Sequence, residues 1–124
     1  MLVIENLFKV ENLEGKKCKY IYRLTKSSFP VEISGEIVNL DCYGIETECQ
    51  EIVDNCVASV ERSAIEKIST SRYKVHNLFK LLFDNSVSPV HLIDVIGEYV
   101  DEYVSDFDTA RIDLEEQFTH SHLG

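Results

Sequence analysis

The apolar spacing of the chain changes within STSRYKVHNLFKLL (residues 69–82). Before this stretch apolar residues recur at every second position, which is typical of strands. Within it the spacing becomes that of one face of a helix, at Val75, Leu78, Phe79 and Leu82. Ser69 or Ser71 can cap this helix by accepting a backbone N–H. The sequence therefore predicts a mainly stranded part, residues 1–68, and a mainly helical part, residues 69–118.

The stranded part predicts an antiparallel sheet of about four to six strands. Its first hairpin joins Leu2–Val10 to Cys18–Thr25, because both segments alternate and a turn-like stretch separates them. A loop is expected around residues 27–30, since Pro30 has no N–H to donate to a strand ladder. The pattern changes register near Gly44. The later expected segments are Val31–Ser34, Ile37–Cys42, Tyr43–Ile52, Cys56–Val60 and Ala64–Ile68.

The helical part predicts a helical hairpin on the sheet. Its second helix begins at Ser88-Pro89, where serine suits the N-cap and proline the first helical position. The apolar side of that helix is expected at Leu92, Ile96, Tyr99, Val100, Tyr103 and Val104. After Ser105 helical spacing continues to Phe118, which adds a third helix as an option. The expected fold is thus α+β in one domain, residues 1–118, followed by a flexible tail at 119–124.

Length and composition favour a single globular domain. The chain has 124 residues, of which 44% are hydrophobic and 27% charged, so a packed core is expected. The N-terminal residues show neither a basic leader nor an apolar stretch long enough for a signal peptide or a membrane span. The four cysteines are few and widely spaced, which favours reduced thiols. We therefore expect a cytoplasmic protein that does not bind membranes.

The charge is concentrated at the C-terminal end of the sequence. The net charge is −10; residues 1–93 contain thirteen acidic and eleven basic residues, whereas residues 94–124 contain nine acidic residues and only Arg111 as a base. Such a field repels phosphate backbones and anionic lipids and attracts basic partners. Direct binding of nucleic acid is therefore disfavoured, and a basic protein surface is the expected partner.

Motifs for catalysis, metals or cofactors are weak. The cysteines lack the close pairs of structural zinc sites, His120 and His122 lie in the expected tail, and the glycines are scattered singly. Acidic pairs such as Glu46 with Glu48 are interpreted as solvated faces. We therefore predict no cofactor, no metal site and no catalytic residue, and a non-enzymatic role is favoured over an enzymatic one.

One stretch resembles a known family. The residues from Tyr43-Gly44-Ile45-Glu46 to Ser88-Pro89-Val90-His91-Leu92-Ile93-Asp94-Val95-Ile96 resemble a family of small uncharacterised proteins from Gram-positive bacteria, a domain of unknown function. The resemblance covers roughly residues 43–104. It implies no activity, substrate or cofactor, and the acidic segment after Ser105 extends past it.

The leading functional hypothesis is a protein that regulates or interacts with another protein through its acidic C-terminal helices. The residues expected to contact the basic partner are Asp94, Glu98, Asp101, Glu102, Asp106, Asp108, Asp113, Glu115 and Glu116. A sharper version is an inhibitor that mimics nucleic acid and occupies a nucleic-acid-binding protein. The alternative is a small enzyme or ligand-binding protein with a pocket between sheet and helices, lined by Tyr20, Tyr22, His91 and Asp94. The sequence does not determine the oligomeric state.

Overall fold

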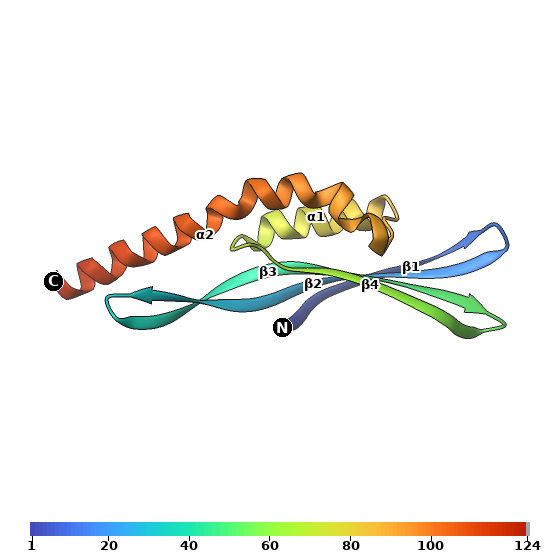
Figure 1. Cartoon of the computed structure of the whole chain (residues 1–124), viewed down its shortest axis with the longest axis horizontal. Helices are drawn as coiled ribbons and strands as arrows, with labels where there is room; N and C mark the ends of the chain where they lie inside the picture. The colour runs from blue at the N-terminus through green and yellow to red at the C-terminus, as the bar shows by residue number, and fades with distance from the viewer. Residues whose placement is uncertain (124) are drawn as a thin grey trace.

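A computed structural model describes residues 1–123 and shows four long strands followed by two helices (Figure 1). The α+β prediction is therefore confirmed. The strands are β1 (Leu2–Leu13), β2 (Lys16–Ile33), β3 (Glu36–Val53) and β4 (Cys56–Ser69). The helices are α1 (Arg72–Asp84), a short 3-10 turn η1 (Pro89–His91) and α2 (Leu92–Leu123).

Three tight hairpins connect the strands into one open antiparallel sheet of order β1-β2-β3-β4. Each hairpin has a two-residue connection in which both residues have positive φ: Glu14-Gly15, Ser34-Gly35 and Asp54-Asn55. Turns of this kind match the right-handed twist of the strands that they join. Local turn chemistry thus sets the register in which each strand pair begins at its turn.

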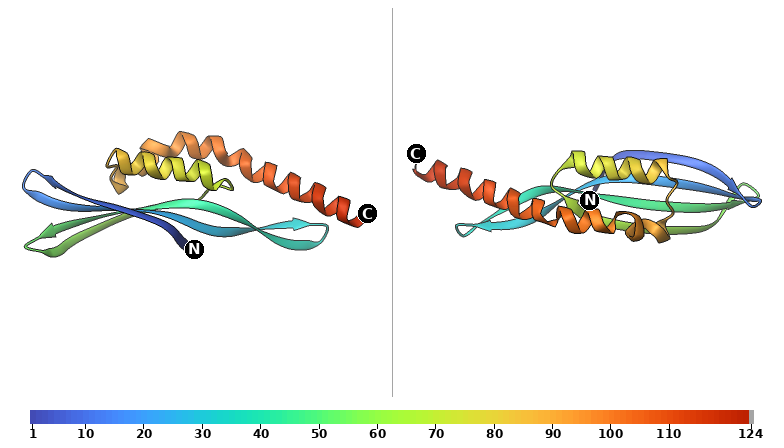
Figure 2. Two further views of the ribbon diagram at one scale, coloured as in Figure 1. Left: turned by 180° about the vertical axis from the view of Figure 1, so that it is seen from behind. Right: turned by 90° about the horizontal axis from the view of Figure 1, so that it is seen from above.

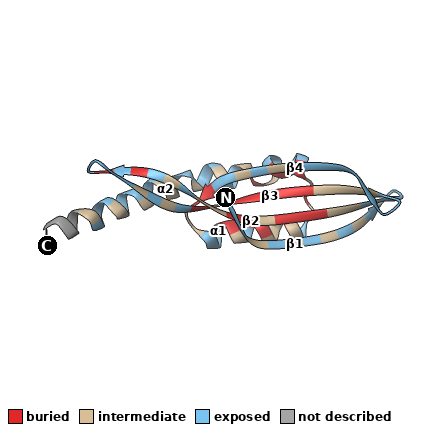
Figure 3. Ribbon diagram, turned by 90° about the horizontal axis from the view of Figure 1, so that it is seen from below, coloured by how far each residue is buried: buried red, intermediate tan, exposed pale blue. Residues whose placement is uncertain are grey.

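Both helices cover the same face of this sheet, and the other face is left uncovered in all views (Figures 1 and 2). The core lies between sheet and helices, where Tyr22, Leu24 and Ile45 meet Phe79 and Leu92. Seen from the uncovered side, the buried positions concentrate in the middle of the two central strands, β2 and β3 (Figure 3). Burying apolar area of this kind is the main favourable contribution to folding.

The four strands agree with the predicted number of about four to six, but they are longer than the expected segments, several of which they join. The expected loop at residues 27–30 is wrong, because β2 continues through Pro30, which lies opposite Asn39 of β3. Pairing of β1 with β2 ends at Lys26, so beyond that residue β2 has a free edge. A proline is tolerated on a free edge because no ladder hydrogen bond is lost there.

The projecting β2–β3 hairpin twists so far that its faces exchange. In the centre of the sheet Tyr20, Tyr22 and Leu24 face the helices, yet farther along β2 it is Val31 that is buried, with the register unbroken. Phe29 on the same face as Val31 packs edge-on against Phe107 of α2, with ring centroids 5.0 Å apart. The right-handed twist of strands explains the exchange, which Figure 1 shows as the crossing of the two ribbons.

Gly44 marks an irregularity between β3 and β4. The register of the pair shifts between Tyr43 and Ile45, where sequence analysis predicts a change. The extra residues of β4 bring its backbone over Gly44, so that a Cβ there would lie 2.2 Å from the carbonyl oxygen of Glu66 and 2.3 Å from that of Ile65. Only glycine fits this close approach of two backbones.

The helical part differs from expectation beyond α1. The buried stripe of α1 and the Ser71 cap, which accepts a hydrogen bond from the Lys74 N–H at 3.3 Å, are as predicted. The helical hairpin is not confirmed. A third helix is not confirmed either, because α2 continues without interruption through Ser105. The Ser105 hydroxyl donates to the Glu102 carbonyl of the preceding turn of the same helix.

Helix α2 is the longest element of the chain. It extends to Leu123, where a tail is predicted from residue 119; Gly124 lies outside the described residues. No helix within residues 1–123 is long and apolar enough to cross a membrane.

Candidate functional site

Helix α2 is anchored on the sheet by one side and exposes the other. Leu92 and Ile96 are fully buried, while Val100, Tyr103 and Phe107 are partly buried along the same side. These residues follow one another at steps of three or four, so they share a face of the helix. The acidic side chains lie at other positions of the helical repeat and therefore face away from the core.

Eight of the nine predicted contact residues are exposed on α2. We call them the acidic face: Asp94, Glu98, Asp101, Glu102, Asp108, Asp113, Glu115 and Glu116. They spread over about half of the helix circumference at 3.6 residues per turn. Helices α1 and α2 lie side by side over the sheet (Figure 2), and the acidic face is on the side of α2 opposite to Leu92 and Ile96, so it is directed to solvent.

The ninth residue, Asp106, serves the fold instead. One of its carboxylate oxygens accepts a hydrogen bond from Ser69 Oγ at 2.6 Å, and Lys74 Nζ lies 2.9 Å and 3.0 Å from its two oxygens. Burial would raise the pKa of Asp106, but the hydrogen bonds from Ser69 and Lys74 outweigh it and lower that pKa. Asp106 thus ties α2 to the end of β4 and the first turn of α1, and it is not free to bind a partner.

The acidic face is weakly neutralised by the helix itself. His91 Nδ1 lies 3.5 Å from Asp94, and Arg111 Nε lies 4.0 Å from Glu115. All four side chains are about half exposed or more, and exposed pairs of this type contribute little. The negative potential of the face is therefore largely retained.

Exposed apolar side chains accompany the acids, and sequence analysis did not predict them. Ile93, Val104 and Ile112 are 66%, 55% and 48% exposed, and Tyr99 is 41% exposed. Tyr99 and Val104, which the sequence places on the apolar side of this helix, are therefore exposed instead of buried with Leu92 and Ile96. Ile93 and Ile112 do not share the helical spacing of the buried residues, and this difference was the sequence signal for their exposure.

The residues of the alternative pocket lie in different environments. Tyr20 and Tyr22 are buried beneath the helices, and the Tyr22 hydroxyl donates to the Val87 carbonyl at 3.0 Å. His91 and Asp94 lie on the surface with side chains 65% and 78% exposed. A shallow cavity of about 390 Å³ lies nearby between β4 and the start of α2, lined by Glu61, Arg62, Ser63, Pro89, Val90 and Ile93. No group of three or more potential metal ligands occurs among the described residues.

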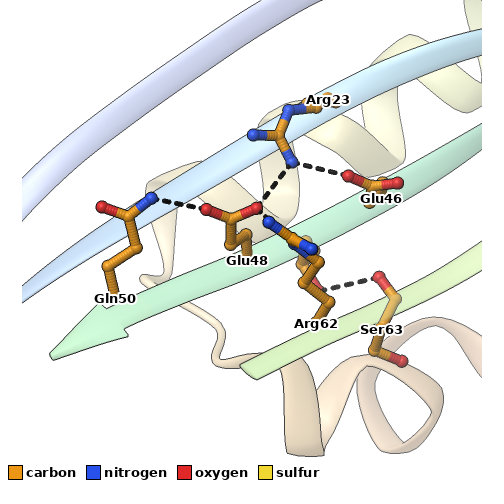
Figure 4. A network of polar contacts seen from close by, with 7 residues as sticks. Arg23, Glu46, Glu48, Gln50, Arg62 and Ser63 are labelled. Carbon is orange, nitrogen blue, oxygen red and sulfur yellow. Dashed lines mark hydrogen bonds and ion pairs between the residues drawn. The ribbon is translucent and has the colours of Figure 1, made fainter. Parts of the chain in front are cut away.

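A polar network occupies the centre of the uncovered sheet face (Figure 4). Glu48 is only 2% exposed and accepts hydrogen bonds from Arg62 Nε at 2.6 Å, Gln50 Nε2 at 2.6 Å and Arg23 at 3.1 Å. The same Arg23 nitrogen lies 2.6 Å from Glu46. The interpretation of Glu46 and Glu48 as a solvated pair is therefore wrong: cross-strand arginines, which strand alternation alone does not reveal, enclose them.

The network lowers the pKa of the Glu48 carboxyl group. Burial would raise its pKa, but the hydrogen bonds from Arg62, Gln50 and Arg23 lower it from 4.5 to about 2. A carboxyl whose pKa is lower in the folded state stabilises the fold above its unfolded pKa, and this contribution is lost as the pH falls through the folded value. Glu48 is thus an acid-sensitive support of the sheet between about pH 4.5 and 2.

Glu48→Gln is expected to remove this acid dependence. Urea unfolding from pH 6 to 2.5 should show a wild-type free energy of unfolding that falls by about 1–3 kcal/mol more than that of the variant. Glu36→Gln, at an exposed hairpin tip, provides the matched control and should retain the wild-type loss. Parallel pH profiles of wild type and Glu48→Gln would show that the network does not hold the carboxylate.

Comparison with known proteins gives a family and no activity. Residues 1–102 match the family of unknown function DUF6514, so the chain belongs to this family. The match covers the sheet, α1 and the first third of α2, which is more than the resemblance over residues 43–104 predicts; the Gram-positive origin stays a prediction. No curated protein and no solved structure matches the chain. Half of the acidic face, namely Asp108, Asp113, Glu115 and Glu116, lies beyond the matched residues.

Proposed function

We propose that this protein is a non-enzymatic interaction or regulatory protein that docks the acidic face of α2 onto a basic protein surface. The observation that carries the proposal is the exposure of eight carboxylates along one helix whose opposite side is fixed to the sheet. Clustered charge of one sign speeds encounter with an oppositely charged surface and fixes its orientation.

The geometry of α2 favours recognition over simple solubility. The acids are held on a helix that is anchored through Leu92, Ile96 and the Asp106 contacts, so their spacing is fixed before binding. The exposed Ile93, Val104 and Ile112 add apolar surface among the charges. An interface that combines apolar contacts with charges can gain affinity as well as encounter rate.

The charge spacing also supports mimicry of nucleic acid as the sharper version of this function. The acidic face extends over about 33 Å of helix, from Asp94 to Glu116, which gives one exposed carboxylate per about 4 Å. A DNA strand carries one phosphate per about 3.4 Å along the axis. A groove that binds phosphates would therefore meet a comparable density of negative charge on α2.

The salt dependence of binding tests the proposal. The tagged protein is used to capture partners from its native cell, and each purified partner is titrated at about 0.05 M and about 0.5 M salt. Screening shortens the range of charge interactions from more than 10 Å to a few ångströms over this interval, so affinity should fall by more than about tenfold. An affinity that is indifferent to salt would reject the electrostatic interface. If α2 mimics nucleic acid, the captured partner should itself bind nucleic acid. DNA or RNA should then compete with this protein for the partner.

A further inference from the structure

The uncovered face of the sheet carries exposed apolar side chains near its edges and polar side chains in its middle. Its residues follow the strand register in cross-strand rows, and the row in the middle of the sheet runs from Phe8 through Ile21 and Glu48 to Arg62. The exposed apolar side chains lie near the two edges, with Phe8 61% exposed on β1 and Val60 44% exposed on β4. The middle is occupied by the polar network around Glu48.

We propose that this face is the interface of a symmetric dimer in which two copies of the chain stack sheet on sheet. A twofold axis parallel to the strands places β1 of one copy over β4 of the other, and β2 over β3. Face-to-face packing of two antiparallel sheets is the arrangement of a β-sandwich. The inference is independent of the proposed function, because the acidic face of α2 lies on the opposite side of each copy.

Several side chains of the face meet suitable partners under this symmetry. Val10 and Val60 belong to the same row, so each Val10 would lie over Val60 of the second copy. In the row on the other side of Glu48, Arg23 would lie over Glu46 of the second copy. In the middle row Phe8 would lie over Arg62, whose guanidinium can stack on the ring, and Ile21 over the enclosed Glu48.

The network is suited to burial in such an interface. Glu48 already has three hydrogen-bond donors within its own chain, and Arg23 bridges Glu46 and Glu48. A charge that is paired and hydrogen-bonded can be removed from water without leaving an unpaired group.

The area of the face agrees with a second copy of this chain as the occupant. Four strands of about ten residues each give about 600 Å² of planar sheet, and the accessible surface over its side chains is larger. A stable interface buries about 800 Å² on each partner. The two sheets can therefore supply an interface of ordinary size.

The test uses two complementary charges. Val10→Glu and Val60→Lys each place a charge opposite a valine twice in the homodimer, so each variant should be monomeric by sedimentation equilibrium at concentrations where wild type dimerises. In a mixture of the two variants, one site pairs the introduced charges and the other keeps the two valines. The mixture should therefore regain a dimer, with an association constant at least about tenfold above that of either variant alone.

Val104→Glu is the matched control, because Val104 is exposed on α2 and away from the sheet face; it should dimerise like wild type. Circular dichroism verifies that each variant is folded, and recovery in the mixture excludes misfolding as the cause of the monomers. A wild type that remains monomeric up to about 200 µM overturns the inference. So do variants that dimerise like wild type, and so does a mixture that stays monomeric.

Discussion

Gly44→Ala is expected to destabilise the protein by about 3 kcal/mol or more, or to prevent folding altogether. The added Cβ would lie 2.2 Å and 2.3 Å from the carbonyl oxygens of Glu66 and Ile65. Both atoms belong to the backbone of β4, so no side chain can turn aside to make room. Relief requires β4 to move away from β3, which would disturb the end of the sheet that leads into α1.

Gly97→Ala is the control for this prediction. Gly97 lies within α2, and a Cβ there would be 3.5 Å from Ile93 Cγ2, an ordinary contact. Alanine is favoured over glycine inside a helix by up to about 1 kcal/mol, so this variant should be equal to or more stable than wild type. Chemical denaturation of both variants checks the pair. Similar stabilities for the two would contradict the close approach of β3 and β4 at Gly44.

Much of the fold could be predicted from local spacing. Alternation through Cys18–Thr25 indicates a half-buried strand, and the stripe through Val75 and Leu82 indicates a helix. The change between these two periods near Ser69 fixes the order of strands before helices. Local sequence carries this information because periods of two and 3.6 residues follow from backbone geometry.

The length of the strands could not be predicted in the same way. In the sequence, Pro30 predicts a loop and Gly44 predicts a change of register. The actual effect of each residue depends on the strand beside it. Pro30 is tolerated because β1 has already ended, and Gly44 is required because β4 crosses close above it. The strand twist also brings the buried Val31 to the side of α2. All three effects are tertiary.

The sequence predicts which acidic residues lie on α2, but it predicts only partly which of them are exposed and which support the fold. The acids of α2 are exposed because the anchoring residues Leu92 and Ile96 take the opposite side, as helical spacing predicts. Asp106 has the same residue type and nearly the same spacing, yet it binds Ser69 and Lys74. Contacts between residues more than thirty positions apart distinguish Asp106 from the exposed acids. Such contacts cannot be predicted from the spacing of residues in a single sequence.

Reversal of four charges on α2 is expected to abolish binding of the basic partner. The variant carries Asp94→Lys, Glu98→Lys, Asp101→Lys and Glu102→Lys, all at exposed positions. Each replaced contact removes an attraction of about 0.5–1 kcal/mol and adds a repulsion of similar size. Even with screening, the sum corresponds to a loss of at least about a hundredfold in affinity. The fold should persist, because none of the four side chains belongs to the core.

A second variant separates position from net charge. It carries Glu32→Lys, Glu36→Lys, Glu61→Lys and Glu66→Lys, also at exposed positions but on the strands. Its net charge equals that of the α2 variant, so long-range attraction is reduced equally. Affinity for the partner should fall by less than about tenfold if the acidic face of α2 is the binding surface.

The most direct measurement is therefore the affinity of one captured partner for wild type and for these two variants, by calorimetry at one salt concentration. Loss of binding only in the α2 variant is the result that our proposal predicts. Equal affinities for the two variants, or full binding by the α2 variant, would contradict it.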